Sequence, residues 1–241
     1  MEEKTKLDWL AFEPLFGSWS PRFKDFFFSG GFDPIYEFLK KESKRGIQIA
    51  PKSENVFRAF KETSINDLKV IIVGMAPYHT FYNNEPIADG LCLSCGITKR
   101  LQPSLENWYL AMEQDIGRGL VLNMVKDPDL IFLARQGCLL LNMGLTVSKG
   151  KPGNMNTLWE PFMKYLFEEV LVTNGVPVIL LGKEASKLKR YIMPFTWIFE
   201  LSHPASASYQ NIQWSSNQTF TKVNQILKEN NNNVIQWFKT E

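Results

Sequence analysis

The chain has 241 residues, of which 44% are hydrophobic and 22% charged, with a formal net charge of +2. Such proportions are ordinary for a soluble globular protein, and the length suits one α/β domain, here residues 1–241, with a sizeable core. No apolar run approaches the roughly 18 residues of a membrane-spanning helix, and the acidic start of the chain lacks the apolar segment of an export signal.

Residues 1–31 are rich in phenylalanine and tryptophan. We expect this stretch to be irregular and to pack on the domain as an N-terminal extension, because exposed aromatic rings would lose much of their burial energy. The next two segments, 35–44 and 55–63, are predicted helices. In the first of them Ile35, Phe38 and Leu39 lie on one face, which is the pattern of an amphipathic helix.

Four short apolar runs predict strands, and they are residues 70–73, 139–142, 178–182 and 197–201. Three helical segments separate or follow them, at 104–116, 159–170 and 220–230, the first with Ser104 as its N-cap. Alternating strands and helices predict a three-layer α/β/α fold around a central, mostly parallel four-stranded sheet. We expect the strands to end at Val73, Leu141, Leu181 and Leu201.

Polar residues follow each of these strands. They are Tyr78 and His79, Asn142, Gly182 and Lys183, and His203. Because parallel strands meet at the same sheet edge with their carboxyl ends, these groups should converge on a ligand pocket. Taken singly, each has a simpler interpretation: a strand-end asparagine often caps a turn, a tyrosine fills a core, and a surface lysine is solvated.

The three cysteines are Cys92, Cys95 and Cys138. Cys92 and Cys95 form a C-x-x-C pair, but no second pair and no nearby histidine motif accompanies it. We therefore expect free thiols in a reducing compartment, with no metal and no cofactor.

Gly74-Met75-Ala76-Pro77-Tyr78-His79 directly follows the first strand. The segment resembles the water-activating motif of uracil-DNA glycosylases, Gly-Gln-Asp-Pro-Tyr-His, with Ala76 at the position of the catalytic aspartate. Further matches run in the same order along the chain, from about Phe28 to Trp237. They are residues 90–94 (the strand of the stacking phenylalanine), 103–107 (the loop that pinches the DNA backbone), 139–147 (the uracil-reading strand), 203–208 (the minor-groove loop), Phe220, Asn224 and 235–237.

The resemblance implies a DNA glycosylase that hydrolyses the N-glycosidic bond of a flipped pyrimidine, with uracil as the expected base. Asn142 would read the Watson–Crick edge of uracil, Tyr78 would exclude the thymine methyl, and His203 would donate to the charge that develops on O2. Met75 and Leu93 would also contact the base. The expected DNA contacts are Pro103, Ser104, His79, Gly182, Lys183, Ser206, Ala207 and Ser208.

Several positions depart from the family pattern. Ala76 replaces the aspartate, Leu93 the stacking phenylalanine, Ala205 a serine and Ala207 the intercalating leucine; Asp89 replaces a histidine, and Asn211 lies near the place of an absent arginine. Three explanations stay open: excision of uracil without the motif carboxylate, a site for a larger 5-substituted pyrimidine, and a catalytically inactive DNA-binding or replication-associated protein. Asp89 or Glu85 could supply a substitute carboxylate, although a solvated loop acid is the commoner role for such a residue.

The same departures predict a preference for single-stranded over duplex DNA. Ala207 cannot fill the space left by an extruded base as leucine would, and Leu93 stacks less well than phenylalanine. We expect a monomer in the cytoplasm of a bacterium, encoded by the host, a virus or a phage, or in another reducing compartment. The resemblance admits a protein inhibitor or a replication partner, and the residues identify neither.

Overall fold

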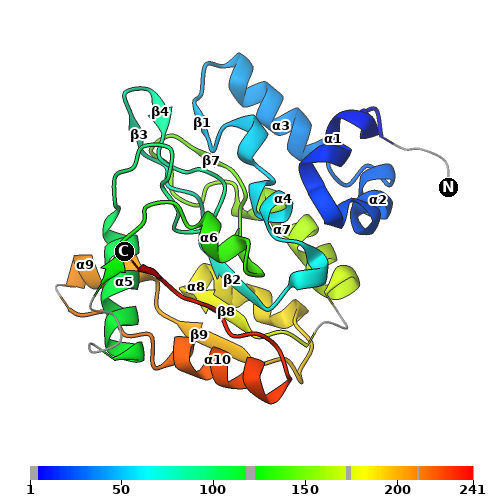
Figure 1. Cartoon of the computed structure of the whole chain (residues 1–241). Coiled ribbons are helices and arrows are strands. Elements are labelled where there is room, and N and C mark those ends of the chain that lie inside the picture. The colour runs from blue at the N-terminus through cyan, green and yellow to red at the C-terminus, as the bar shows by residue number, and fades with distance from the viewer. Residues whose placement is uncertain (1–4, 118–122, 172–174, 211, 241) are drawn as a thin grey trace.

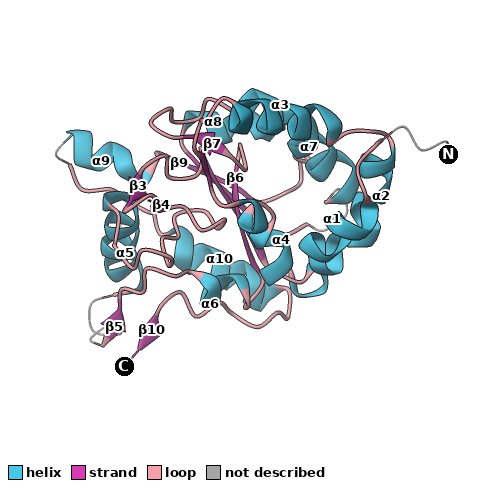
Figure 2. Cartoon of the chain, turned by 90° about the horizontal axis from the view of Figure 1, so that it is seen from above, coloured by secondary structure: helices cyan, strands magenta, loops and turns pink. Residues whose placement is uncertain are grey.

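The computed structural model describes residues 5–117, 123–171, 175–210 and 212–240. At its centre is a parallel sheet of four strands in the order β6-β2-β8-β9, with helices on both sides (Figure 1 and Figure 2). The strands are β2 (Val70–Gly74), β6 (Cys138–Asn142), β8 (Val178–Leu181) and β9 (Ile198–Leu201). Every residue of β2, β6 and β8 is buried, as expected of continuous apolar runs covered on two faces.

The predicted α/β architecture and its four strands are confirmed. β8 and β9 end at Leu181 and Leu201 as predicted. β2 and β6 each continue one residue beyond prediction, because Gly74 pairs with Asn142 in the ladder between them. The polar side chain of Asn142 is therefore carried on the last residue of a buried strand.

The N-terminal stretch was expected to be irregular, and that expectation is wrong. It forms α1 (Trp9–Phe16), a 3-10 turn at Gly17–Trp19 and α2 (Ser20–Phe28). Asp8 caps α1 by accepting from the Leu10 amide at 3.0 Å. The aromatic residues sit at helical spacing and face inward, with Phe16, Trp19, Phe23 and Phe27 fully buried. Aromatic residues are so frequent in this stretch that the helical periodicity cannot be recognised from the pattern of apolar and polar residues.

The remaining helices surround the sheet. They are α3 (Asp33–Lys44), α4 (Arg58–Glu62), α5 (Pro103–Ile116), α6 (Ile131–Ala134), α7 (Asn156–Tyr165) with a π turn at Leu166–Val170, α8 (Lys183–Ser186), α9 (Pro204–Gln210) and α10 (Thr219–Glu229). Short 3-10 turns lie at Ser53–Asn55, Ile65–Asp67 and Lys187–Tyr191. The predicted helix 55–63 is thus shorter than expected. In the described part of the chain, no helix has both the length and the hydropathy to span a bilayer.

Two local predictions fail. Ser104 is not an N-cap: α5 begins at Pro103, and the extended residue before it is Gln102. Proline at the first helical position needs no amide partner, so the helix starts one residue earlier than the serine signal suggests. Residues 90–94 are not a strand but a loop, in which Leu93 adopts a left-handed φ of 64°.

Three two-stranded ribbons complete the fold: β1 (Ile49–Ala50) with β7 (Val147–Ser148), β3 (Phe81–Tyr82) with β4 (Glu85–Pro86), and β5 (Met124–Val125) with β10 (Lys239–Thr240). The segment before β10 is held by two side-chain amides. Asn224 accepts from the amide of Ile235 at 2.9 Å and donates to its carbonyl at 3.0 Å. Gln136 makes the same two bonds to Gln236, at 2.8 and 3.0 Å.

Candidate active site

Four strand ends place the candidate residues along one edge of the sheet. The order β6-β2-β8-β9 gives the sequence Asn142, then the segment 74–79, then Gly182, then His203. This is the edge where parallel α/β sheets hold their ligands. The structure therefore brings residues from four distant parts of the chain to neighbouring positions, as the strand pattern predicted.

The amide of Asn142 is the most ligand-like group at this edge. The residue is only 6% exposed and forms no side-chain hydrogen bond with another described residue, yet its amide atoms are not among the fully enclosed polar atoms that lack a partner. Gly74 lies directly beside it: a Cβ at that position would approach Asn142 Oδ1 to 2.8 Å and Cys92 Sγ to 2.5 Å. An amide that keeps access from outside at a mostly buried position, beside a glycine that leaves it room, is suited to pair with a ligand.

Tyr78 is fixed at its hydroxyl end. The hydroxyl donates to the carbonyl of Leu93 at 3.0 Å and lies 2.6 Å from Ser104 Oγ. Since the single phenolic hydrogen goes to Leu93, Ser104 is the donor to Tyr78. Burial raises the pKa of Tyr78 well above its ordinary value of 10, so the phenol is neutral.

Ser104 is 3% exposed and is engaged with Tyr78. Its expected contact with a DNA phosphate stays a prediction, and one that requires the hydroxyl to exchange partners. Sequence reasoning did not foresee this bond, because the two residues are 26 positions apart and carry no pairing signal.

His203 lies at the end of β9 in a defined tautomer. Its Nδ1 accepts from the amide of Ala205 at 3.2 Å, which leaves the hydrogen on Nε2. Burial lowers the pKa of His203 below its ordinary value of 6.5, which favours neutral imidazole. Gly182, with φ of 87°, makes room for it, since a Cβ there would lie 3.0 Å from His203 Cβ. Lys183 follows as the first residue of α8.

His79 also carries an unsatisfied group. Its Nδ1 is buried and has no hydrogen-bond partner, while its backbone carbonyl accepts from Gly150 at 2.9 Å. Met75 and Ala76 precede it and are half-buried. The methyl of Ala76 offers no acceptor to a water molecule, so the segment itself contains no carboxylate base.

The candidate minor-groove segment is helical and packs on α5. Asn107 of α5 donates to the carbonyl of Pro204 at 2.8 Å and to Ser208 Oγ at 3.0 Å. Ser206 Oγ donates to the carbonyl of His203 at 2.7 Å, and Ser208 is exposed. Ala207 was expected at the DNA surface, but it is only 1% exposed. The helical turn directs its methyl toward the protein, so Ala207 faces the core in this structure. The related departure at Asn211 lies outside the described residues.

Asp89 is not a solvated loop acid, as one of its two interpretations held. It is fully buried, and its carboxylate accepts from Ser94 Oγ at 2.6 Å and from the amides of Gly96 and Leu91 at 2.9 and 3.2 Å. Arg58 forms an ion pair with it at 2.9 Å. Burial nevertheless raises its pKa above the ordinary value. With these partners, Asp89 organises the loop that carries Leu93, and its role as a substitute base stays a hypothesis.

Glu85, by contrast, is exposed and pairs with Lys52 at 2.5 Å. Among the residues that the structure describes, no group of three or more His, Cys, Asp or Glu side chains could hold a metal ion. Cys92, Cys95 and Cys138 are free and buried. Burial raises the pKa of both Cys92 and Cys95 to about 12, so these thiols are protonated and unreactive at neutral pH.

Comparison with known proteins points to one family. The model of the uracil DNA glycosylase superfamily matches residues 60–228. A uracil-DNA glycosylase from Streptococcus pneumoniae serotype 19F (strain G54) is 34% identical over 225 residues, which are 92% of this chain and 98% of the relative.

Solved structures agree in fold. A crystal structure of mimivirus uracil-DNA glycosylase aligns with a TM-score of 0.80 at 23% identity, covering 96% of this chain and 90% of that one. The mimivirus UNG variant Y322F, in complex with UGI, aligns with a TM-score of 0.81 at 24% identity, covering 98% and 92%. UNG from Nitratifractor salsuginis aligns with a TM-score of 0.55 at 16% identity, covering 91% and 94%.

Proposed function

Because the chain belongs to the uracil-DNA glycosylase superfamily, we propose that it removes uracil from DNA by hydrolysing the N-glycosidic bond. Its family and fold support a DNA glycosylase. The observation that favours uracil is the amide of Asn142, which is free to pair with a ligand at the same sheet edge as the fixed ring of Tyr78. An amide can accept from N3–H and donate to O4, whereas cytosine presents the opposite pattern and would leave buried groups unpaired.

The other groups at the sheet edge suit the remaining steps. Tyr78 would stand against C5 of the flipped base, where it leaves no room for the methyl of thymine. Nε2–H of His203 would donate to O2 as negative charge develops there, because its Nδ1 is already an acceptor. His79 and Lys183 would hold phosphates and so keep the nucleotide extruded. The backbone amides of Gly182 and Ser206 do not take part, because they donate to the carbonyls of Leu201 and His203.

Ala76 sets the expected rate. Loss of a general base typically removes about 10²–10⁴ in rate, so excision should be slower than in an enzyme with the motif aspartate. Two other outcomes are distinguishable from this one. A larger 5-substituted pyrimidine would have to displace Tyr78, which two hydrogen bonds hold in place. A protein without catalysis would bind DNA and cut nothing.

We also propose that single-stranded DNA is the better substrate. Ala207 faces the core, with only 1% of its surface exposed. A base extruded from a duplex therefore leaves a gap that the side chain of residue 207 does not fill. Single strands need no such compensation, since their bases are already free to leave the stack.

The test is single-turnover excision on oligonucleotides that contain one uracil, followed by alkali cleavage. The wild-type chain should cut single-stranded uracil DNA faster than duplex. Asn142→Ala should abolish cutting, while the control Asn232→Ala, an exposed asparagine beyond α10, should leave it unchanged. Full activity of Asn142→Ala would refute the pocket assignment. Cutting of a 5-substituted pyrimidine but not of uracil would refute uracil as the substrate. DNA binding without any cutting would refute the proposed glycosylase activity.

A further inference from the structure

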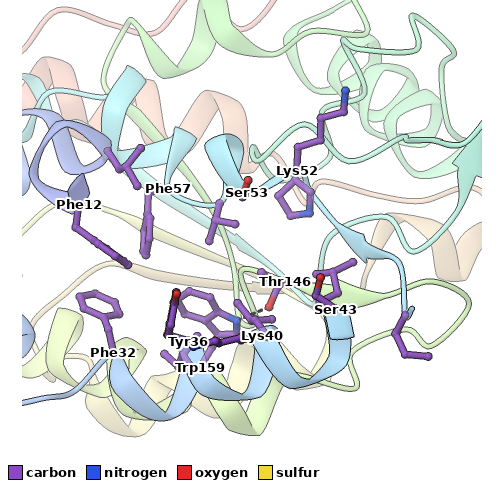
Figure 3. Close-up of a pocket in the computed structure, with 17 residues that line it drawn as sticks. Phe12, Phe32, Tyr36, Lys40, Ser43, Lys52, Ser53, Phe57, Thr146 and Trp159 are labelled. Atoms are coloured by element: carbon purple, nitrogen blue, oxygen red, sulfur yellow. Dashed lines mark hydrogen bonds between the residues drawn. The ribbon is translucent and has the colours of Figure 1, made fainter. Parts of the chain in front are cut away.

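A second cavity lies away from the strand ends, between α3 and the segment 51–57, with α1 at one end (Figure 3). Its volume is about 540 Å³, which falls in the range of small-molecule sites. None of the candidate base-binding or DNA-binding residues lines it. The cavity is therefore separate from the proposed glycosylase site and does not depend on that function.

The walls are apolar and aromatic. Phe12, Phe32 and Phe57 gather at one end of the cavity in Figure 3, and Trp159 lies along the wall formed by α7. The indole of Trp159 donates to Thr146 Oγ1 at 2.7 Å, so the polar atoms at this wall are already satisfied. This part of the cavity offers contact area to an apolar chain or ring and no unmet hydrogen bond.

The lining also contains polar and positively charged residues. Lys40, Ser43, Lys52 and Ser53 belong to its lining. Lys52 is neutralised by Glu85 at 2.5 Å. Lys40 has no carboxylate within ion-pair distance among the described residues, and its Nζ lies 5.5 Å from the centre of the Tyr36 ring. One uncompensated ammonium group thus stands at the mouth of an apolar cavity, supported by an aromatic ring.

We propose that this cavity binds an amphipathic monocarboxylate, a molecule with an apolar chain and one terminal carboxylate. The apolar part lies among the phenylalanines, and the carboxylate pairs with Lys40 near the hydroxyl of Ser43. A single negative charge suits the site, because Lys52 is already paired and only one ammonium group is left to compensate. A dianionic phosphate would keep one charge unpaired at the edge of an apolar surface.

Decanoate is the probe, with decanol and decylamine as its neutral and cationic analogues. Binding to the full-length protein is measured by isothermal titration calorimetry. Decanoate should bind at one site, at least about tenfold more tightly than decanol, and decylamine should not bind. Lys40→Met, at an exposed position, should remove the preference for decanoate over decanol by weakening decanoate alone, with Lys41→Met on the same helix as the control.

A second variant tests the cavity itself. Val56→Trp places a large side chain in it and should abolish binding of both decanoate and decanol, and thermal unfolding shows whether that variant is folded. Lys40→Met keeps the test decisive if it is not. The proposal is overturned if the three probes bind equally well, if Lys40→Met binds decanoate like the wild type, or if a folded Val56→Trp variant still binds it.

Discussion

The hydroxyl groups of Tyr78 and Ser104 lie 2.6 Å apart, and this contact joins the segment after β2 to the first turn of α5. The hydroxyl of Tyr78 in turn donates a hydrogen bond to the carbonyl of Leu93. Three elements that the proposed function assigns to the base and the DNA backbone are thus connected through one phenol. The ring of Tyr78 can act as a rigid wall because its far end is held in two places.

Tyr78→Phe and Ser104→Ala should each lower the free energy of unfolding by about 1–2 kcal/mol, since each leaves a buried polar partner unpaired. The double variant should cost clearly less than the sum of the two, because both single changes break the same bond. Urea unfolding of the four proteins measures this coupling. Strict additivity would show that the two hydroxyls do not interact in solution.

Ala76→Asp places a carboxylate where the family activates water. Excision of uracil should rise by roughly 10² or more, because the proposed groups that bind uracil are present at the sheet edge and only the general base that activates water is missing. Ala76→Asn introduces a side chain of nearly the same volume as aspartate but without its charge, and it should give no such gain. Single-turnover rates on a uracil oligonucleotide measure the effect, and equal rates for both variants would mean that water is activated in another way.

Asp89→Asn should be strongly destabilising, by about 3 kcal/mol, because it breaks a buried ion pair with Arg58 and weakens the loop bonds around it. Glu85→Gln should change stability little, since Glu85 is exposed. Both changes replace a carboxylate by an amide, so denaturant unfolding of the two variants distinguishes the effect of burial from the effect of losing a charge. If Asp89→Asn left stability intact but removed excision, Asp89 would be a catalytic acid or base rather than a loop organiser.

Ala207→Leu should destabilise the protein by about 1–3 kcal/mol, because a larger side chain is forced into the packed contact between α9 and α5. It should bring no gain on duplex DNA relative to single strands. Thermal unfolding and paired excision rates test both statements. A duplex-specific increase without loss of stability would mean that α9 turns residue 207 outward when DNA is bound.

His203 gives a pH dependence of known sign. Its pKa is lowered in the folded protein, so the unfolded chain binds a proton first as the pH falls below 6.5. Stability should therefore decrease on acidification through this window and level off below the folded pKa. His203→Gln should lose that part of the slope. Nitrogen-detected NMR should find Nδ1 unprotonated at neutral pH, and a hydrogen on Nδ1 would contradict the bond from Ala205.

Much of the fold could be predicted because its signals are local. Four apolar runs ended by glycine or polar residues gave the strands, and their parallel order brought Asn142, Gly182 and His203 to one edge. Contacts between residues far apart in sequence could not be predicted. No sequence pattern around Asp89 predicts its ion pair with Arg58, and none around Ser104 predicts its hydrogen bond with Tyr78.

Local signals also misled where two principles competed. Ser104 looked like an N-cap, but Pro103 began the helix. The inward orientation of Ala207 depends on a helical turn whose sequence, Pro-Ala-Ser-Ala-Ser, equally suits a loop. The cavity bounded by Phe12, Phe57 and Trp159 left no trace in the sequence, because each of these residues also has the pattern of an ordinary core residue.

The side-chain amides of Asn224 and Gln136 hold residues 235 and 236 by hydrogen bonds, and this has a consequence for biosynthesis. The indole of Trp237, in the next position, is buried against Phe220 at a ring distance of 5.0 Å. The helices on either side precede this segment in the chain, and they keep an open apolar slot until it packs into place. We expect a nascent chain that is stalled before Ile235 to expose this slot, so it should be a target for chaperones and proteases.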